Sequence, residues 1–175
     1  MAASRDKLVV TPLTARLWPT FVDLLDEGGP ASRCWCMAPR IGASYRRQSP
    51  GQNRDAFQDI VEEGPPPGLL ALEGKTAVGW CQLTPREVVP AVERSWRTRR
   101  VDGLPVWLIS CFYVRKGHRR QGITAGYWGF LRRRGRGVVS ALADGSGRNV
   151  GTHTATSGRC SRSLRTERLV HPHPR

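Results

Sequence analysis

The sequence lacks any apolar stretch close to the roughly 20 residues that a helix needs to cross a bilayer, since its longest hydrophobic runs have the length of strands. It also lacks a charged N-terminal region followed by an apolar segment, which is the pattern of a secretory signal. These absences predict a protein that is neither secreted nor integral to a membrane. We expect it in the cytoplasm.

Acidic residues are scarce. The 175 residues include 28 lysines and arginines but only 14 aspartates and glutamates, which gives a formal net charge of +14 and an isoelectric point near 11.1. This excess favours a polyanionic partner, and nucleic acid, an acidic surface and a phosphate-rich cofactor all qualify. The total charge does not select among them, because attraction to phosphate carries no chemical specificity of its own.

Cysteine is sparse and irregularly spaced. The five cysteines are an odd number without the framework of a disulfide-stapled domain, which predicts reduced thiols. Cys34 and Cys36 flank Trp35 in a CxC spacing, but no second pair of ligands lies nearby, so we predict no metal site and interpret this segment as packed or substrate-lining. No histidine or acidic partner is suggested beside a cysteine, which argues against a cysteine nucleophile.

The patterns that are present indicate one mixed α/β domain. A length of 175 residues with 39% hydrophobic residues suits a single core. A helix with Phe21 and Leu24 on its apolar face is expected after a Thr14 cap. The other expected elements are a strand within 7–14, a polar linker to residue 50, a helix over 53–64, a hairpin of 68–73 and 76–84, a partly helical excursion over 85–100 and a central strand over 106–114. The unbroken apolar character of 106–114 predicts a strand covered on both faces.

The segment HRRQGIT, residues 118–124, joins this central strand to a helix with Ile123 and Tyr127 on one face. The first N–H groups of a helix lack partners, so a strand-to-helix turn binds anions, and Gly122 allows a phosphate to approach closely. The countercharge comes from Arg115, Lys116, His118, Arg119 and Arg120. A pyrophosphate fits this turn, while the absence of GxxxxGK[ST] and GxGxxG disfavours nucleotide triphosphatases and dinucleotide folds.

The run FYVRKGHRRQGITAG resembles the acetyl-CoA motif of the GCN5-related N-acetyltransferases, a strand followed by [QR]xxGx[GA] at the start of a helix. Arg119, Gly122 and Thr124 take the three motif positions, with threonine in place of the usual Gly or Ala. The blocks CWCM, PPGLLA, VGWC and PVWLISCFYV are similar to a bacterial subgroup of mostly unassigned substrate, so the resemblance covers roughly residues 7 to 134.

The resemblance implies the acyl-CoA N-acyltransferase fold, a mixed and mostly antiparallel sheet flanked by helices, with acetyl-CoA as co-substrate and no metal. It implies cofactor contacts at Phe112, Val114, Arg115, Arg119, Arg120, Gln121, Gly122, Ile123 and Thr124.

The resemblance also implies direct attack of an amine on the thioester. In the family, backbone N–H groups near the end of the central strand, here around 112–114, polarise the thioester carbonyl, and this strand splays from the next to admit the pantetheine arm. A base and an acid complete the chemistry. Glu87, beyond the strand before the central one, is the candidate base, with a surface role as the alternative. Tyr113 supplies the hydroxyl nearest the thioester, with a core or pocket-wall role as the alternative.

The end of the chain departs from this pattern. We expect a domain over residues 1–142 and a basic, poorly ordered tail over 143–175, where Gly, Arg, Ser, Thr and His dominate and Tyr is absent. Residues 138–143, VVSALA, are the candidate for the next strand of the sheet. Little in the sequence after them could form the family's closing hairpin. The bias resembles a high-GC gene read out of frame and predicts a frameshifted or truncated product.

Two functions follow from the sequence. The first is an N-acetyltransferase that acts on a primary amine, with the acceptor and the oligomeric state open. The second is a catalytically impaired, acetyltransferase-like module that binds CoA or, weakly, nucleic acid through its basic residues. The tail lacks the aromatic residues that usually stack on bases, which weakens the nucleic-acid alternative.

Overall fold

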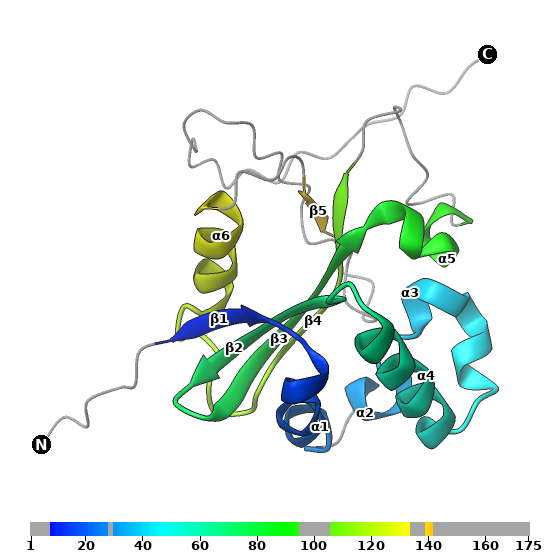
Figure 1. The fold of residues 1–175 in the computed structure, drawn as a ribbon, viewed down its shortest axis with the longest axis horizontal. Coiled ribbons are helices and arrows are strands. Elements are labelled where there is room, and N and C mark those ends of the chain that lie inside the picture. Colours follow the sequence, from blue (N-terminus) through cyan, green and yellow to red (C-terminus); the bar gives the residue numbers. More distant parts are fainter. Residues whose placement is uncertain (1–7, 28–29, 95–105, 134–138, 142–175) are drawn as a thin grey trace, which may run out of the picture.

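The structure is a computed structural model that describes residues 8–27, 30–94, 106–133 and 139–141 (Figure 1). Within these ranges the strands form one sheet in the order β1-β2-β3-β4-β5. The pairs from β1 to β4 are antiparallel, and β5 runs parallel to β4. The predicted mixed, mostly antiparallel sheet flanked by helices is confirmed. The tail predicted over 143–175 lies outside the described residues.

The strands are β1 (Val9–Pro12), β2 (Gly68–Glu73), β3 (Thr76–Pro85), β4 (Trp107–Val114) and β5 (Val139–Ala141). The α-helices are α1 (Trp18–Leu25), α2 (Pro30–Cys34), α3 (Ala38–Ile41), α4 (Pro50–Glu63), α5 (Pro90–Glu93) and α6 (Ile123–Arg133), and the 3-10 turns are η1 (Ala15–Leu17), η2 (Gly42–Arg46) and η3 (Arg86–Val88). None of the described helices has both the length and the apolar character that crossing a membrane requires.

Three details of the expected order are corrected. Thr14 makes no side-chain capping hydrogen bond, because the short turn η1 separates it from α1. The segment expected as a polar linker before residue 50 contains α2, α3 and η2, which are too short to show a helical period in the sequence. α4 begins at Pro50, three residues earlier than expected, because Ser49 and Gln52 form a reciprocal capping box there.

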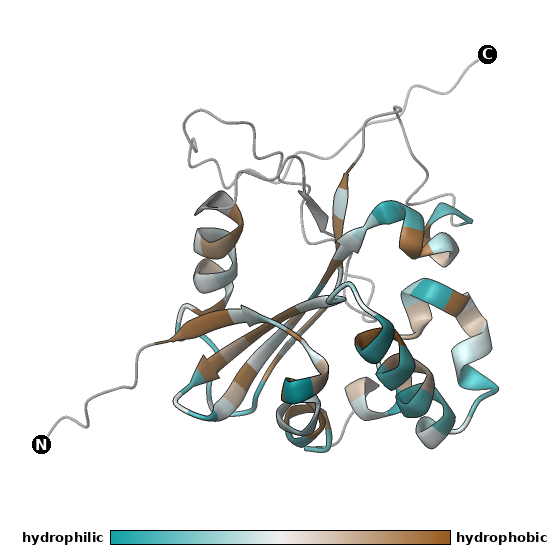
Figure 2. Cartoon of the chain, in the orientation of Figure 1, coloured by the Kyte–Doolittle hydropathy of each residue, from teal (hydrophilic) through white to brown (hydrophobic). Residues whose placement is uncertain are grey.

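Helices cover the two faces of the sheet, with α1, α2 and α4 on one side and α6 on the other (Figure 1). Figure 2 shows hydrophobic residues along the strands between these layers. On the α1 face, Phe21 and Trp80 lie in a cluster of buried aromatic rings. On the α6 face, Ile123 and Tyr127 pack with Val78 and other strand residues. The amphipathic spacing predicted for α6 therefore matches its buried face.

The central strand β4 carries side chains to both faces. Leu108 and Ile109 are buried in different clusters, which confirms coverage of both faces at this point. Beyond them, Cys111 and Tyr113 pack toward the α1 face and Phe112 toward the α6 face, each half-buried. The β4 segment from residue 110 is therefore less covered than its apolar sequence predicts.

Candidate active site

The middle of β4 is irregular. Gln82 of β3 pairs with Cys111, whereas the next residue, Leu83, pairs with Ile109, so Ser110 is an extra residue in the ladder. Its hydroxyl oxygen is buried and has no hydrogen-bond partner in the described part of the chain. Bulges of this kind bend a strand and are over-represented next to active sites.

The pairing of β4 with β5 ends just before this bulge. Residues 107–109 of β4 pair with residues 139–141 of β5, and within the described ranges no strand pairs with the outer edge of β4 beyond Ile109. The backbone groups of Phe112 and Val114 lie in this edge segment. A bulge, followed by a strand edge that no described strand covers, is compatible with a slot between β4 and β5.

A tight basic loop connects the end of β4 to α6. Gly117 has φ 89° and Gly122 φ 82°, conformations that favour glycine, and Arg120 has φ 64°. The loop is closed internally: the backbone N–H of His118 donates to the Arg115 carbonyl at 3.0 Å, and Nε2 of Gln121 donates to the Gly117 carbonyl at 2.8 Å. These bonds hold the turn in one shape.

α6 begins immediately after Gly122, and the backbone N–H of Gly126 donates to the Gly122 carbonyl at 3.1 Å. The N–H groups before Gly126 in this first turn have no intrahelical acceptor, and the positive end of the helix dipole lies there. A Cβ built on Gly122 would meet no atom within 4 Å, so the space in front of this helix end is open. The helix end is therefore accessible to an anion.

Three cations surround this helix end without being neutralised. Lys116, Arg119 and Arg120 are exposed, and none has an ion pair or hydrogen bond within the described residues. His118 turns instead to the hairpin, where its Nε2 lies 3.6 Å from Oε2 of Glu73. Of the other motif residues, Thr124 is exposed, whereas the Ile123 side chain is buried in the α6 cluster and offers only its backbone.

Arg115 is placed differently from the sequence prediction. Its Nη2 lies 2.5 Å from Oδ2 of Asp23, its Nη1 lies 2.9 Å from Oε1 of Glu27, and its Nε donates to the Ala77 carbonyl at 2.7 Å. The guanidinium thus attaches the end of β4 to α1. Because all three nitrogens are engaged there, we assign Arg115 a structural role and remove its side chain from the cofactor contacts.

Replacing Arg115 with alanine is expected to lower the free energy of unfolding by about 1–3 kcal/mol, because the buried Ala77 carbonyl loses its donor. Urea unfolding measures this loss. Arg16→Ala is the matched control: Arg16 is exposed in η1, and its removal is expected to change stability by no more than about 0.5 kcal/mol. Equal stability of the two variants would contradict the structural role.

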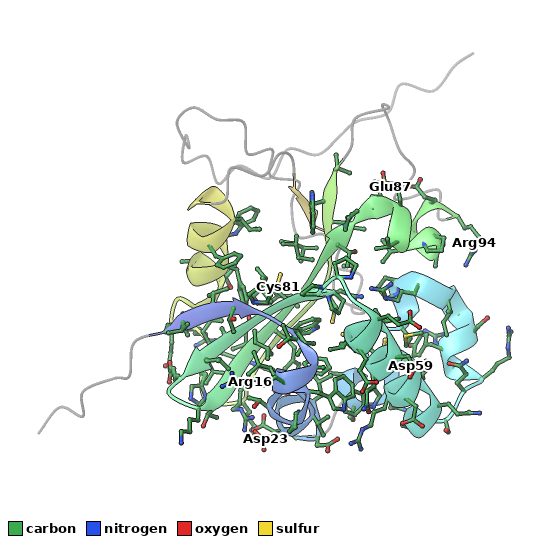
Figure 3. All side chains as sticks on the ribbon, viewed as in Figure 1. Arg16, Asp23, Asp59, Cys81, Glu87 and Arg94 are labelled. Atoms are coloured by element: carbon green, nitrogen blue, oxygen red, sulfur yellow. The ribbon has the colours of Figure 1, made fainter. Side chains whose placement is uncertain are left out.

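The two candidate catalytic residues lie at opposite ends of β4. Tyr113 pairs with Trp80, whereas Glu87 is exposed in η3, just beyond the pairing of Pro85 with Trp107. The ladder between these ends is about 20 Å long at the usual rise per residue. Figure 3 shows Glu87 near α5, far from Asp23 on α1, the helix that Tyr113 faces. The structure therefore does not bring Glu87 and Tyr113 together.

Tyr113 has a polar environment that the sequence did not reveal. Burial raises the pKa of its hydroxyl, and the carboxylate of Glu27, which shares a hydrogen bond with it, raises the pKa further. The positive charges of Arg119 and Arg115 act in the opposite direction. Tyr113 therefore remains protonated at neutral pH, beside the basic loop.

Comparisons with known proteins identify the fold. The sequence matches no protein-family model and no curated protein. Among solved structures, the aminoglycoside N-acetyltransferase AAC(6')-Iy in complex with CoA is similar at 10% identity and a TM-score of 0.52, over 91% of this chain and 99% of that one. The aminoglycoside 6'-N-acetyltransferase AAC(6')-Ih from Acinetobacter baumannii is similar at 11% identity and a TM-score of 0.52, over 90% of this chain and 100% of that one. The chain has the fold of the GCN5-related N-acetyltransferases.

Proposed function

We propose that this protein transfers an acetyl group from acetyl-CoA to a primary amine by direct attack of the amine on the thioester. The observation that carries the proposal is the open N-terminus of α6, preceded by a glycine with positive φ and flanked by Lys116, Arg119 and Arg120. An anion-binding helix end of this kind suits a diphosphate. The presence of CoA in a solved neighbour of the same fold supports this choice of ligand.

The cofactor is expected to run from this loop along the open edge of β4. The diphosphate would contact the backbone N–H groups from Gly122 to Thr124, with Arg119 and Arg120 as countercharge and Gln121 holding the loop closed. The pantetheine arm would lie beside the edge of residues 110–114 that no described strand covers. Backbone groups around Phe112 and Val114 would then face the thioester, where preorganised N–H donors stabilise a developing oxyanion.

Proton transfer is proposed for two residues that lie apart, Glu87 in η3 and Tyr113 near the end of β4. Glu87 is the candidate base and would act through water, because it lies beyond the start of β4. Tyr113 is the candidate acid for the departing thiolate, and its raised pKa keeps the hydroxyl protonated at neutral pH. The acetylation itself is expected to take place in the cytoplasm.

A thermal-shift titration tests the cofactor assignment. CoA at about 100 times its Kd is expected to raise Tm by about 5–10 °C, because a ligand that binds only the folded state stabilises it by mass action. Pantetheine, which lacks the diphosphate, is expected to leave Tm unchanged. Absence of any CoA response would overturn the proposal.

The alternative function, a basic module for nucleic acid, is favoured by the net charge of +14. A fluorescently labelled RNA oligonucleotide tests it, since binding through phosphates weakens steeply as salt increases. RNA binding with a steep salt dependence, together with no response to CoA, would replace the acetyltransferase proposal with this one.

A further inference from the structure

Thiols from distant parts of the sequence meet on the α1 face of the sheet. Nε1 of Trp80 donates a hydrogen bond to Sγ of Cys36 at 3.0 Å, and Nε2 of Gln82 donates to the Cys36 carbonyl at 3.3 Å. Cys36 is therefore fixed over β3. Cys111 is the neighbour of Gln82 across the β3–β4 ladder, and it packs against the buried cluster that contains Cys36. Sequence spacing gave no sign of this meeting.

The turn that carries Cys36 has an unusual backbone. Trp35 has φ 46° and Cys36 φ 60°, so two successive residues with side chains lie in the left-handed region. Such conformations cost free energy and persist where the surrounding structure enforces them, often at functional sites. Here the hydrogen bonds from Trp80 and Gln82 hold them, and they fix Cys36 over β3.

The two thiols differ in accessibility and acidity. Cys36 is buried, whereas Cys111 is half-buried. The hydrogen bond from Cys36 lowers the pKa of Cys111, while burial and the contact with Cys111 raise the pKa of Cys36. Cys111 has the lower pKa of the pair, so we take it as the thiol that ionises and reacts first. Among the described residues, no group of three or more His, Cys, Asp or Glu side chains is arranged to hold a metal ion.

We propose that Cys36 and Cys111 form a modification site at which hydrogen peroxide converts two thiols into a reversible disulfide. The Cys111 thiolate attacks one peroxide oxygen, the O–O bond breaks, and a sulfenic acid and, after protonation, one water are formed. Sγ of Cys36 then attacks the sulfenic sulfur, its proton leaves with the hydroxyl group as a second water, and the S–S bond forms. The two thiols are oxidised by two electrons, the peroxide is reduced to two waters, and a dithiol reductant reverses the change.

The disulfide would join the turn between α2 and α3 to β4 directly after the bulge. Because it closes a long loop of the chain, it is expected to raise Tm by about 5–10 °C relative to the reduced protein. The site stands on the contacts of Cys36 and Cys111, so it does not depend on the proposed acetyltransferase function. A normal Tm response to CoA in the reduced protein, measured in parallel, separates failure of one proposal from failure of the other.

Mass spectrometry of the full-length chain tests the proposal. The protein is treated with one equivalent of hydrogen peroxide, and the remaining thiols are then alkylated. After the mass of the added alkyl groups is subtracted, the protein is expected to be about 2 Da lighter than its reduced form, because one disulfide has replaced two thiols. Peptide mapping is expected to join the peptides of Cys36 and Cys111, and dithiothreitol is expected to separate them.

Matched serine variants provide the controls. Cys36→Ser and Cys111→Ser are each expected to abolish the cross-link, whereas Cys81→Ser, buried on the α6 face, and Cys160→Ser are expected to retain it. If Cys36→Ser fails to fold, the half-buried Cys111→Ser variant decides the result. Persistent free thiols at both positions, or a disulfide that joins either cysteine to Cys34 or Cys160, would overturn the assignment.

Discussion

Replacing Gly122 with glutamate is expected to abolish the stabilisation of this protein by CoA, so that the shift in Tm falls from about 5–10 °C to less than about 1 °C. Gly122 has φ 82°, and a side chain at this position would project into the open space before α6. The glutamate would place a negative charge where the diphosphate is expected. Repulsion, steric blockage and backbone strain then all act against binding.

Gly64→Glu is the matched control. Gly64 has φ 66° and, like Gly122, has no atom within 4 Å of a built Cβ, but it lies at the end of α4. The two variants therefore share the strain and the added charge, and only their positions differ. Gly64→Glu is expected to lower the starting Tm while retaining the CoA response. The double variant Arg119→Ala and Gly122→Glu removes a cation as well, and an unchanged response in it would remove the site assignment.

The elements that the sequence predicted well are those whose signals are local. The apolar run of β4, the glycine before α6 and the spacing of Ile123 and Tyr127 lie within some twenty residues of one another along the chain. A strand, a turn and a helix can each be predicted from such neighbouring residues. The strand predicted within 138–143 also corresponds to β5, whose bounds are Val139–Ala141.

Features that depend on contacts between residues far apart in the sequence were not predicted. Arg115 belongs to the basic motif by its position, but its charge is taken up by Asp23 and Glu27, which are 92 and 88 residues away. Composition cannot distinguish an arginine that faces a ligand from one that faces a helix. The meeting of Cys36 and Cys111 was missed for the same reason, since it depends on the register of β3 with β4.

The bulge at Ser110 is another feature that the sequence did not predict. A bulge adds one residue to a strand without changing its hydrophobic character, so the sequence WLISCFYV resembles an uninterrupted strand. The register shows the extra residue only when both strands are aligned. This residue decides which backbone groups of β4 face the open edge, and hence the geometry expected of the thioester site.

Replacing Phe21 with alanine is expected to lower the free energy of unfolding by about 3–5 kcal/mol, the range for removing a buried aromatic side chain. Phe21 is fully buried, and its ring centroid lies 4.8 Å from that of Trp80, 5.4 Å from that of Trp18 and 5.5 Å from that of Phe57. Its loss would leave a cavity bordered by α1, α4 and β3. Since small proteins are stable by only about 5–15 kcal/mol, a large part of the total would be lost.

Urea unfolding followed by tryptophan fluorescence measures this effect, and a midpoint lowered by roughly 1.5–3 M is expected at ordinary slopes. Phe21→Leu keeps most of the apolar volume and is expected to cost less than half as much. Val88→Ala, at a position that is 43% exposed, is expected to change the midpoint little. A loss below about 1 kcal/mol in Phe21→Ala would mean that the aromatic cluster does not hold α1 on the sheet. Because Trp80 belongs to that cluster and also donates to Cys36, such a result would weaken the fixed geometry on which the thiol pair depends.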